Sequence, residues 1–127
     1  EKSARYFQPA PNGAIGVNPR FLHPKPQRYN YDMYHGIDYT IDVAQPMGQR
    51  ITALTYHGQP VQADQLLDVT VNQYRAVGGG NYTMFGPQQI VRENQKDMTE
   101  LIADYLQAHP VITATADDNF RVINSSK

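Results

Sequence analysis

The chain has 127 residues, the length of about one domain, and 11 Lys and Arg against 12 Asp and Glu leave a net charge of −1. So small a charge supplies no field that would attract a nucleic-acid polymer or an anionic membrane. The chain has no cysteine, which excludes disulfides and thiol nucleophiles, and no apolar run is long enough for membrane insertion.

The N-terminal part is predicted to contain little regular structure. Residues 1–8 have the composition of the last turns of a helix, and nothing before Glu1 caps a helix start, so we expect a domain truncated at its N-terminus. From Pro9 to Pro26 the chain holds five of its nine prolines and shows neither helix nor strand periodicity. This stretch is predicted to be a surface loop.

Strand signals begin after this loop. Tyrosines alternate with polar residues over 29–31, and a longer apolar alternation over 37–43 predicts a half-buried strand. A run of β-forming residues over 50–57 predicts a second strand, paired with the first as a hairpin. The same kind of alternation predicts a further strand over 67–74, with the tyrosine at its end on the polar face.

The clearest helix is predicted over residues 97–108. Asp97 and Glu100 have the spacing of a capping box at its start, and Pro110 ends it. Its apolar side chains recur at helical spacing: Met98, Leu101, Ile102, Tyr105 and Leu106. A short final strand is predicted over 119–123.

The sequence contains no arrangement of residues typical of catalysis. Its four histidines lack partners at the spacing that metal ligands need, and no serine nucleophile motif is present. Asp38 and Asp42 share one face of the predicted strand and could form an acid–base pair, but the solvated side of a half-buried strand is the favoured interpretation. We therefore predict neither catalytic nor metal-binding residues in this chain.

One segment combines an aromatic residue, a cation and a run of glycines. Tyr74 and Arg75 are followed by Gly78, Gly79 and Gly80. Glycine runs occur where the backbone needs a positive φ or a close approach, and a ring on a polar face beside such a loop can stack on a planar base. A tight turn with a buried tyrosine is the alternative interpretation.

Several segments of the sequence together resemble a known family. They are residues 29–32 (Tyr-Asn-Tyr-Asp), 36–43 (Gly-Ile-Asp-Tyr-Thr-Ile-Asp-Val), 46–51 (Pro-Met-Gly-Gln-Arg-Ile), 58–61 (Gly-Gln-Pro-Val) and 72–80 (Asn-Gln-Tyr-Arg-Ala-Val-Gly-Gly-Gly). They are similar to the C-terminal domain of the bacterial 2',3'-cyclic-nucleotide 2'-phosphodiesterase/3'-nucleotidases, which belong to the wider 5'-nucleotidase family. The resemblance runs from Glu1 to about Ile123.

This resemblance implies an α+β fold, with a mixed sheet flanked by helices, and a place in a two-domain secreted hydrolase. The N-terminal metallophosphoesterase domain of such a protein holds two divalent metals and carries out the chemistry. The present chain would then be the distal part of the substrate-binding domain, inert alone and without a cofactor of its own. Its partners would be a nucleotide substrate and its own N-terminal catalytic domain, and its location would be extracytoplasmic.

The resemblance also implies which residues bind substrate. In this family two aromatic rings sandwich the nucleobase, and Tyr74 matches the second ring, while the first is expected before Glu1. Asn72 and the glycines 78–80 complete the predicted substrate-binding set. Arg75 is expected to have a structural role, paired with a carboxylate.

One position bears on substrate choice. Gly80 stands where 5'-nucleotidases have an Asp that holds the ribose hydroxyls, which favours the cyclic phosphodiesterase branch over a 5'-nucleotidase. A 5'-nucleotidase remains one alternative. A non-enzymatic surface module for adhesion or glycan binding is another, because its β-structure would also be rich in Tyr, Asn and Gln.

Overall fold

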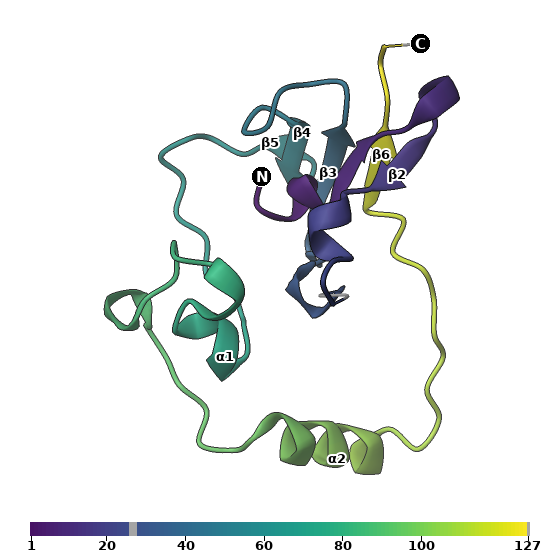
Figure 1. Ribbon diagram of the computed structural model, residues 1–127. Helices are drawn as coiled ribbons and strands as arrows, with labels where there is room; N and C mark the ends of the chain where they lie inside the picture. The colour runs from purple at the N-terminus through teal and green to yellow at the C-terminus, as the bar shows by residue number, and fades with distance from the viewer. Residues whose placement is uncertain (26–27, 127) are drawn as a thin grey trace. The chain divides into compact units, whose positions relative to one another are not determined.

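The computed structural model describes residues 1–25 and 28–126 (Figure 1). The chain divides into two compact units. The first unit consists of residues 1–66 and 117–127, and it contains the sheets. The second consists of residues 67–116 and contains the helices α1 and α2. Among the described residues, no helix has the length and apolar character needed to cross a membrane.

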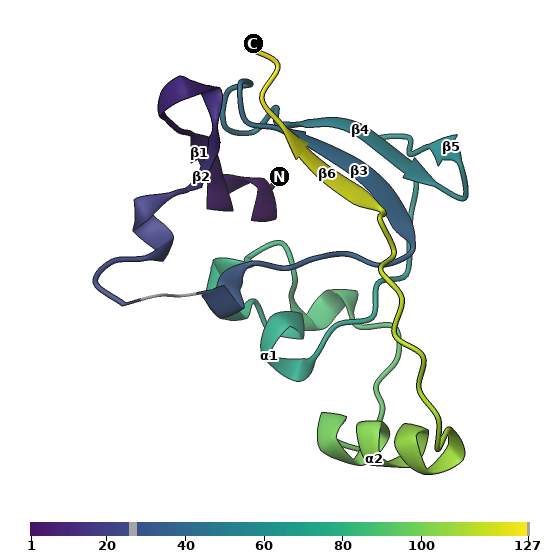
Figure 2. The same ribbon diagram turned by 90° about the vertical axis from the view of Figure 1, so that its right-hand side faces the viewer.

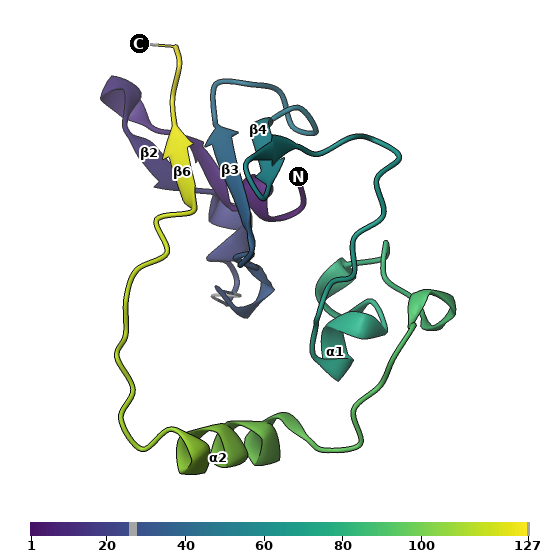
Figure 3. The ribbon, with the colours of Figure 1, turned by 180° about the vertical axis from the view of Figure 1, so that it is seen from behind.

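The larger sheet of the first unit is mixed and four-stranded, in the order β5–β4–β3–β6. Strand β3 (Ile37–Asp42) pairs antiparallel with β4 (Ile51–Tyr56) and parallel with β6 (Phe120–Ile123), and Figures 2 and 3 show these three side by side. The short β5 (Gln59–Pro60) extends the sheet beyond β4. The predicted hairpin, the final strand and the α+β class with a mixed sheet are therefore confirmed.

The core of this unit lies on one face of β3. Tyr39, Ile41 and Val43 are buried and pack with Ala4 from the N-terminal segment. The apolar alternation over 37–43 thus marks the face that meets the core. Thr40 and Asp42 on the other face are buried as well, so the end of β3 is covered on both sides. Half-buried side chains surround this cluster: Phe7, Tyr34, Ile37, Ile51, Leu54, Phe120 and Val122.

The N-terminal segment differs from its prediction. Instead of the end of a helix, it forms a single 3₁₀ turn (Ser3–Tyr6) followed by strand β1 (Phe7–Pro9). The expected loop is partly ordered, because β2 (Ile15–Val17) pairs antiparallel with β1. Prolines 11 and 19 begin two further 3₁₀ turns, at Pro11–Gly13 and Pro19–Phe21. The last residue of the expected loop, residue 26, lies outside the described residues, as does residue 27.

The predicted strand over 29–31 is also wrong, and a 3₁₀ turn occupies Arg28–Asn30. Aromatic packing replaces strand pairing here. The ring of Tyr31 lies 4.7 Å from that of Tyr6 and 5.4 Å from that of Phe7, measured between centroids. Tyr6 in turn contacts Phe21 edge to face. The alternating tyrosine therefore marks a cluster of rings, a pattern that sequence alternation alone cannot separate from a strand.

The second unit contains short helices and turns. Helix α1 is a single turn (Gln73–Ala76), and 3₁₀ turns occupy Gly79–Asn81 and Pro87–Gln89. The strand predicted over 67–74 is therefore wrong. Residues 67–72 have no regular structure, and Asn72 caps the start of α1 with its side-chain oxygen, which accepts from the Arg75 N–H at 2.9 Å. Asn is a preferred residue at this position, so the chain begins a helix here although its apolar alternation is typical of a strand.

Helix α2 (Met98–Ala108) follows its prediction closely. The capping box is complete, because the Glu100 N–H donates to Asp97 Oδ1 at 2.9 Å and the Asp97 N–H donates to Glu100 Oε2 at 3.1 Å. Lys96 and Asp104 add an exposed ion pair. None of the residues of α2 is buried, although its apolar face suits packing. Its local bonds therefore carry much of its helical order.

We expect Asp97→Ala to loosen α2 alone. Loss of an N-cap acceptor costs about 1 kcal/mol, and α2 buries none of its residues. Amide hydrogen exchange over 98–108 should become faster, while exchange in β3 and β4 should stay unchanged. Asp104→Ala is the control, because it removes a carboxylate from the same helix and breaks only an exposed ion pair. Equal acceleration in the sheet would contradict a local role for this cap.

Candidate functional site

The predicted site residues gather around helix α1 in the second unit. Tyr74 is on α1, and its side chain is well exposed, with 52% of the residue accessible. A tyrosine buried in a tight turn, the alternative interpretation, does not match this exposure. An exposed aromatic ring on an ordered backbone can stack on a planar group. Tyr74 is therefore available for such a contact within this chain.

Asn72, the second predicted residue, holds the local backbone. Its side-chain oxygen is engaged by the Arg75 N–H, and its backbone oxygen accepts from Arg75 and Ala76 at 3.1 and 2.9 Å. These bonds define the start of the short helix that carries Tyr74. The structure therefore gives Asn72 a capping role, and a contact between Asn72 and substrate stays a prediction.

The three glycines are each explained by the turn that follows α1. Gly78 and Gly80 have φ values of 85° and 68°, in the left-handed region that favours glycine. Gly79 lies against Tyr74. A Cβ added at Gly79 would lie 2.6 Å from Cδ2 and from Cε2 of the Tyr74 ring, and would also clash with the Tyr74 carbonyl oxygen. The turn thus packs directly on the ring predicted to stack.

Arg75 points into the unit while Tyr74 is exposed. Arg75 is only 6% exposed, and its Nη1 donates to the Gly79 carbonyl oxygen at 2.6 Å. Its guanidinium carbon lies 3.9 Å from the ring centroid of Tyr82, a cation–π contact. A structural role for Arg75 is thus in line with its burial, while its expected carboxylate partner stays a prediction.

Tyr82 is the residue of this site that the sequence did not reveal. It is fully buried, and its ring lies parallel to that of Phe85 at a centroid distance of 6.4 Å. The only signal in the sequence is a second aromatic residue soon after the glycine run. The ring of Tyr82 thus lies under the Arg75 guanidinium, and the exposed ring of Tyr74 lies beside the glycine turn.

Asp38 and Asp42 do not form the pair that a shared strand face would predict. Asp38 is exposed, whereas Asp42 is buried at 3% accessibility. The register shift between Thr40 and Ile41 places the extra residue on β4, and Tyr39, Ile41 and Val43 still share one core cluster, so β3 keeps its alternation. Asp42 is buried because Ser125 and Gln45 cover it at the end of β3. The expectation that both belong to the solvated face is therefore wrong for Asp42.

The buried carboxylate of Asp42 accepts four hydrogen bonds. Ser125 donates from its hydroxyl to Oδ2 at 2.5 Å and from its N–H to Oδ1 at 3.1 Å. The Ala44 N–H donates to Oδ1 at 3.0 Å, and the Gln45 amide donates to Oδ2 at 3.2 Å. Chiefly because of the Ser125 hydroxyl, the pKa of Asp42 is lowered to about 2. This carboxylate therefore binds Ser125 to the end of β3.

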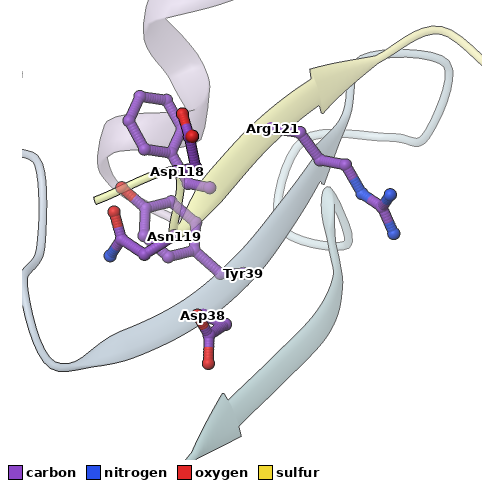
Figure 4. Close-up of a pocket in the computed structure, with 6 residues that line it drawn as sticks. Asp38, Tyr39, Asp118, Asn119 and Arg121 are labelled. Atoms are coloured by element: carbon purple, nitrogen blue, oxygen red, sulfur yellow. The ribbon is translucent and has the colours of Figure 1, made fainter. Parts of the chain in front are cut away.

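A shallow pocket of about 200 Å³ lies in the first unit, where β3 and β6 begin (Figure 4). Its floor includes the stacked rings of Tyr39 and Phe120, 5.3 Å apart and nearly parallel. Asp38, Asp118 and Asn119 line it, and Arg121 points away from the Tyr39 ring in Figure 4. Small-molecule sites usually occupy about 300–1,000 Å³, so this pocket is too small to be favoured as the nucleoside site.

A metal centre is not supplied by the residues described. Within 1–25 and 28–126, no group of three or more His, Asp or Glu side chains is arranged to hold a metal ion. The residues present therefore do not fit the divalent metals that the resemblance implies for the larger protein. No step of metal chemistry is assigned to them.

Comparisons with known proteins place this geometry in a family. The model of the 5'-nucleotidase C-terminal domain matches residues 18–87, which include Tyr74 and the glycine turn. A Staphylococcus aureus protein assigned as a 5'-nucleotidase, crystallised with alpha-ketoglutarate, has a similar structure with a TM-score of 0.87 and 37% sequence identity. The match covers 97% of this chain and 24% of that one.

Curated relatives carry related names. The chain is 27% identical, over 86% of its length, to the trifunctional nucleotide phosphoesterase protein YfkN of Bacillus subtilis, and covers 8% of that protein. It is 30% identical, over 74% of its length, to the 2',3'-cyclic-nucleotide 2'-phosphodiesterase/3'-nucleotidase of Salmonella typhimurium, and covers 17% of it. The chain thus spans less than a fifth of the curated relatives it matches. With more than half of its residues matched by the family model, the chain belongs to the 5'-nucleotidase C-terminal domain family.

Proposed function

We propose that this chain is the nucleoside-positioning part of a metal-dependent nucleotide phosphohydrolase, with Tyr74 as a stacking surface for the nucleobase. The observation that carries the proposal is the half-exposed ring of Tyr74, braced by Gly79 inside the segment that the family model matches. The names of the relatives, which are nucleotide phosphoesterases, support the choice of a nucleotide as ligand.

In this proposal the chain contributes binding and orientation. Stacking on Tyr74 would hold the nucleoside so that its phosphate reaches the reactive centre in a fixed position, which converts binding energy at a distance into rate. The divalent metals would be held outside the described residues, in an N-terminal catalytic domain of an extracytoplasmic protein. Because stacking tolerates every base, we expect broad base preference.

The proposal also assigns the chain to the cyclic phosphodiesterase branch of the family. Gly80 has no side chain to reach ribose hydroxyls, which favours 2',3'-cyclic nucleotides and 3'-nucleotides as substrates. A 5'-nucleotidase is the second candidate, because the similar solved structure at 37% identity is assigned that activity. Rates of the full-length protein on 2',3'-cyclic AMP, 3'-AMP and 5'-AMP separate the two. A dominant rate on 5'-AMP would contradict the first.

Tyr74→Ala in the full-length protein tests the stacking role. Loss of one stacking contact costs about 1–3 kcal/mol, so kcat/KM for 2',3'-cyclic AMP should fall roughly tenfold to hundredfold. Hydrolysis of bis-(p-nitrophenyl) phosphate, which has no nucleobase, should change little. Tyr74→Phe should retain nearly full activity, because the ring face rather than the hydroxyl makes the contact.

The matched control is Tyr105→Ala, because Tyr105 on α2 has a similar exposure of 56%. It should leave both substrates unaffected. An equal loss on both substrates in Tyr74→Ala, with a lowered melting temperature, would make Tyr74 a packing residue. No hydrolysis of any nucleotide by the full-length protein would instead favour an adhesion or glycan-binding module.

A further inference from the structure

We propose that Arg75 is a positioning residue of this site, which fixes the Gly78–Gly80 turn under the ring of Tyr74 and so holds the ring ready for the base. The inference rests on the proposed function and names a residue through which Tyr74 is kept in place. Tyr74 and Arg75 are neighbours in the chain, and the first faces outward while the second is buried.

The first step is the anchoring of the guanidinium. Its Cζ lies 3.9 Å from the ring centroid of Tyr82, which is fully buried and stacked with Phe85. A planar guanidinium can stack on a ring face while its N–H groups donate sideways in the same plane. A lysine ammonium has no such plane, so it can keep the charge but not this combination of contacts.

The second step is the hold on the turn. Nη1 of Arg75 donates to the Gly79 carbonyl oxygen at 2.6 Å, a charge-assisted bond of the stronger kind. The turn itself needs such a tether, since Gly78 and Gly80 on either side have positive φ values and glycine backbones are the most mobile when free. Arg75 therefore sets where the Gly79 backbone lies.

The third step joins the turn to the ring. The space where a Cβ of Gly79 would lie is filled by Tyr74, whose Cδ2 and Cε2 would be only 2.6 Å from it. The guanidinium carbon is 5.6 Å from the Tyr74 ring centroid, so Arg75 also borders the ring directly. With Gly79 held in place, the ring cannot swing toward the turn. A ring ordered before binding loses less entropy when the base stacks on it.

The test is Arg75→Lys in the full-length protein, assayed on 2',3'-cyclic AMP and on bis-(p-nitrophenyl) phosphate. Ordering one side chain on binding predicts a rise in KM for the nucleotide of about twofold to tenfold, with kcat nearly unchanged. The substrate without a base should be unaffected. Arg20→Lys, the same change at an exposed arginine of the first unit, is the matched control and should alter neither substrate.

A second variant covers the case in which Arg75→Lys does not fold. Tyr82→Leu keeps an apolar side chain but removes the ring face under the guanidinium, and it should raise the nucleotide KM in the same selective way. Melting temperatures of all variants report whether the fold is intact. A selective effect in either variant supports the proposal, and an equal loss on both substrates in the folded variant overturns it.

The double variant with Tyr74→Ala separates this inference from the proposed function. If Arg75 acts through the ring, Arg75→Lys should have no further effect on the nucleotide once the ring is gone, because residues that act as a unit are not additive. Additive losses, with Tyr74→Ala itself selective for the nucleotide, would overturn the role of Arg75 alone. If Tyr74→Ala is not selective, the proposed function fails and the positioning role fails with it.

Discussion

Arg50→Met is expected to destabilise the first unit by about 2–4 kcal/mol. Arg50 is only 6% exposed, and its guanidinium joins the N-terminal segment to the turn between β3 and β4. Nε donates to the Gln45 carbonyl oxygen at 3.1 Å, and Nη1 donates to those of Ala4 and Phe7 at 3.2 and 2.6 Å. A methionine fills much of the volume but leaves these carbonyl groups without the charged donor.

The loss should be largest at the N-terminal segment. Ala4 belongs to the buried core, so release of residues 3–9 exposes that core as well. Urea unfolding followed by circular dichroism measures the total loss of unfolding free energy. Hydrogen exchange over 3–9 and 15–17 shows whether that loss is concentrated in the N-terminal segment. Arg5→Met is the control, because it makes the same chemical change at an exposed arginine on the same segment. A similar loss in both variants would contradict the anchoring role of Arg50.

The sheet could be predicted from the sequence because its signal is local. The alternation over 37–43 records which side of β3 meets the core, and a β-rich run follows at hairpin distance. Helix α2 could be predicted equally well, since its capping box and apolar spacing lie within the helix itself. The parallel pairing of β6 with β3 was not predictable from the chain alone, because the partners are some 80 residues apart and no local pattern records that contact.

Residues that join distant segments were missed for the same reason. Nothing near Arg50 in the sequence indicates that Ala4 and Phe7 accept its hydrogen bonds. Asp42 was placed with Asp38 on a solvated face, because strand alternation tells which face a residue is on but not what covers that face. Its actual partner, Ser125, lies at the other end of the chain.

At the candidate site, the sequence selected candidate residues, whose contact with substrate stays a prediction, but it did not reveal how they are arranged. The glycine run and the aromatic residue before it were sufficient to select Tyr74 and its turn. The strand predicted to carry the tyrosine proved to be a capped helical turn, since Asn72 offers the backbone a cap that alternation does not reveal. The hold of Arg75 on Gly79 depends on a left-handed turn, which only the folded backbone defines.

Asp42 is expected to make the fold sensitive to acid. Its folded pKa of about 2 lies below the ordinary value of 3.8 because Ser125, Ala44 and Gln45 donate to the ionised carboxylate. A group whose pKa is lowered by folding adds stability above its unfolded pKa and loses it as the pH falls through the folded one. The contribution of Asp42 should therefore be complete at neutral pH and should disappear between about pH 4 and pH 2.

Asp42→Asn isolates this contribution. The amide keeps one acceptor oxygen but places a donor where Oδ2 accepts from the Ser125 hydroxyl and the Gln45 amide, so the variant should unfold at a lower urea concentration at pH 7. The difference in urea midpoint between the variant and the wild-type chain should narrow as the pH falls from 4 to 2, because the wild-type carboxylate is then protonated and is neutral like the amide. Asp64→Asn, at an exposed carboxylate, should reproduce the wild-type profile. A difference that stays constant over this pH range would show that Asp42 stabilises the fold through its shape and neutral contacts rather than through its charge.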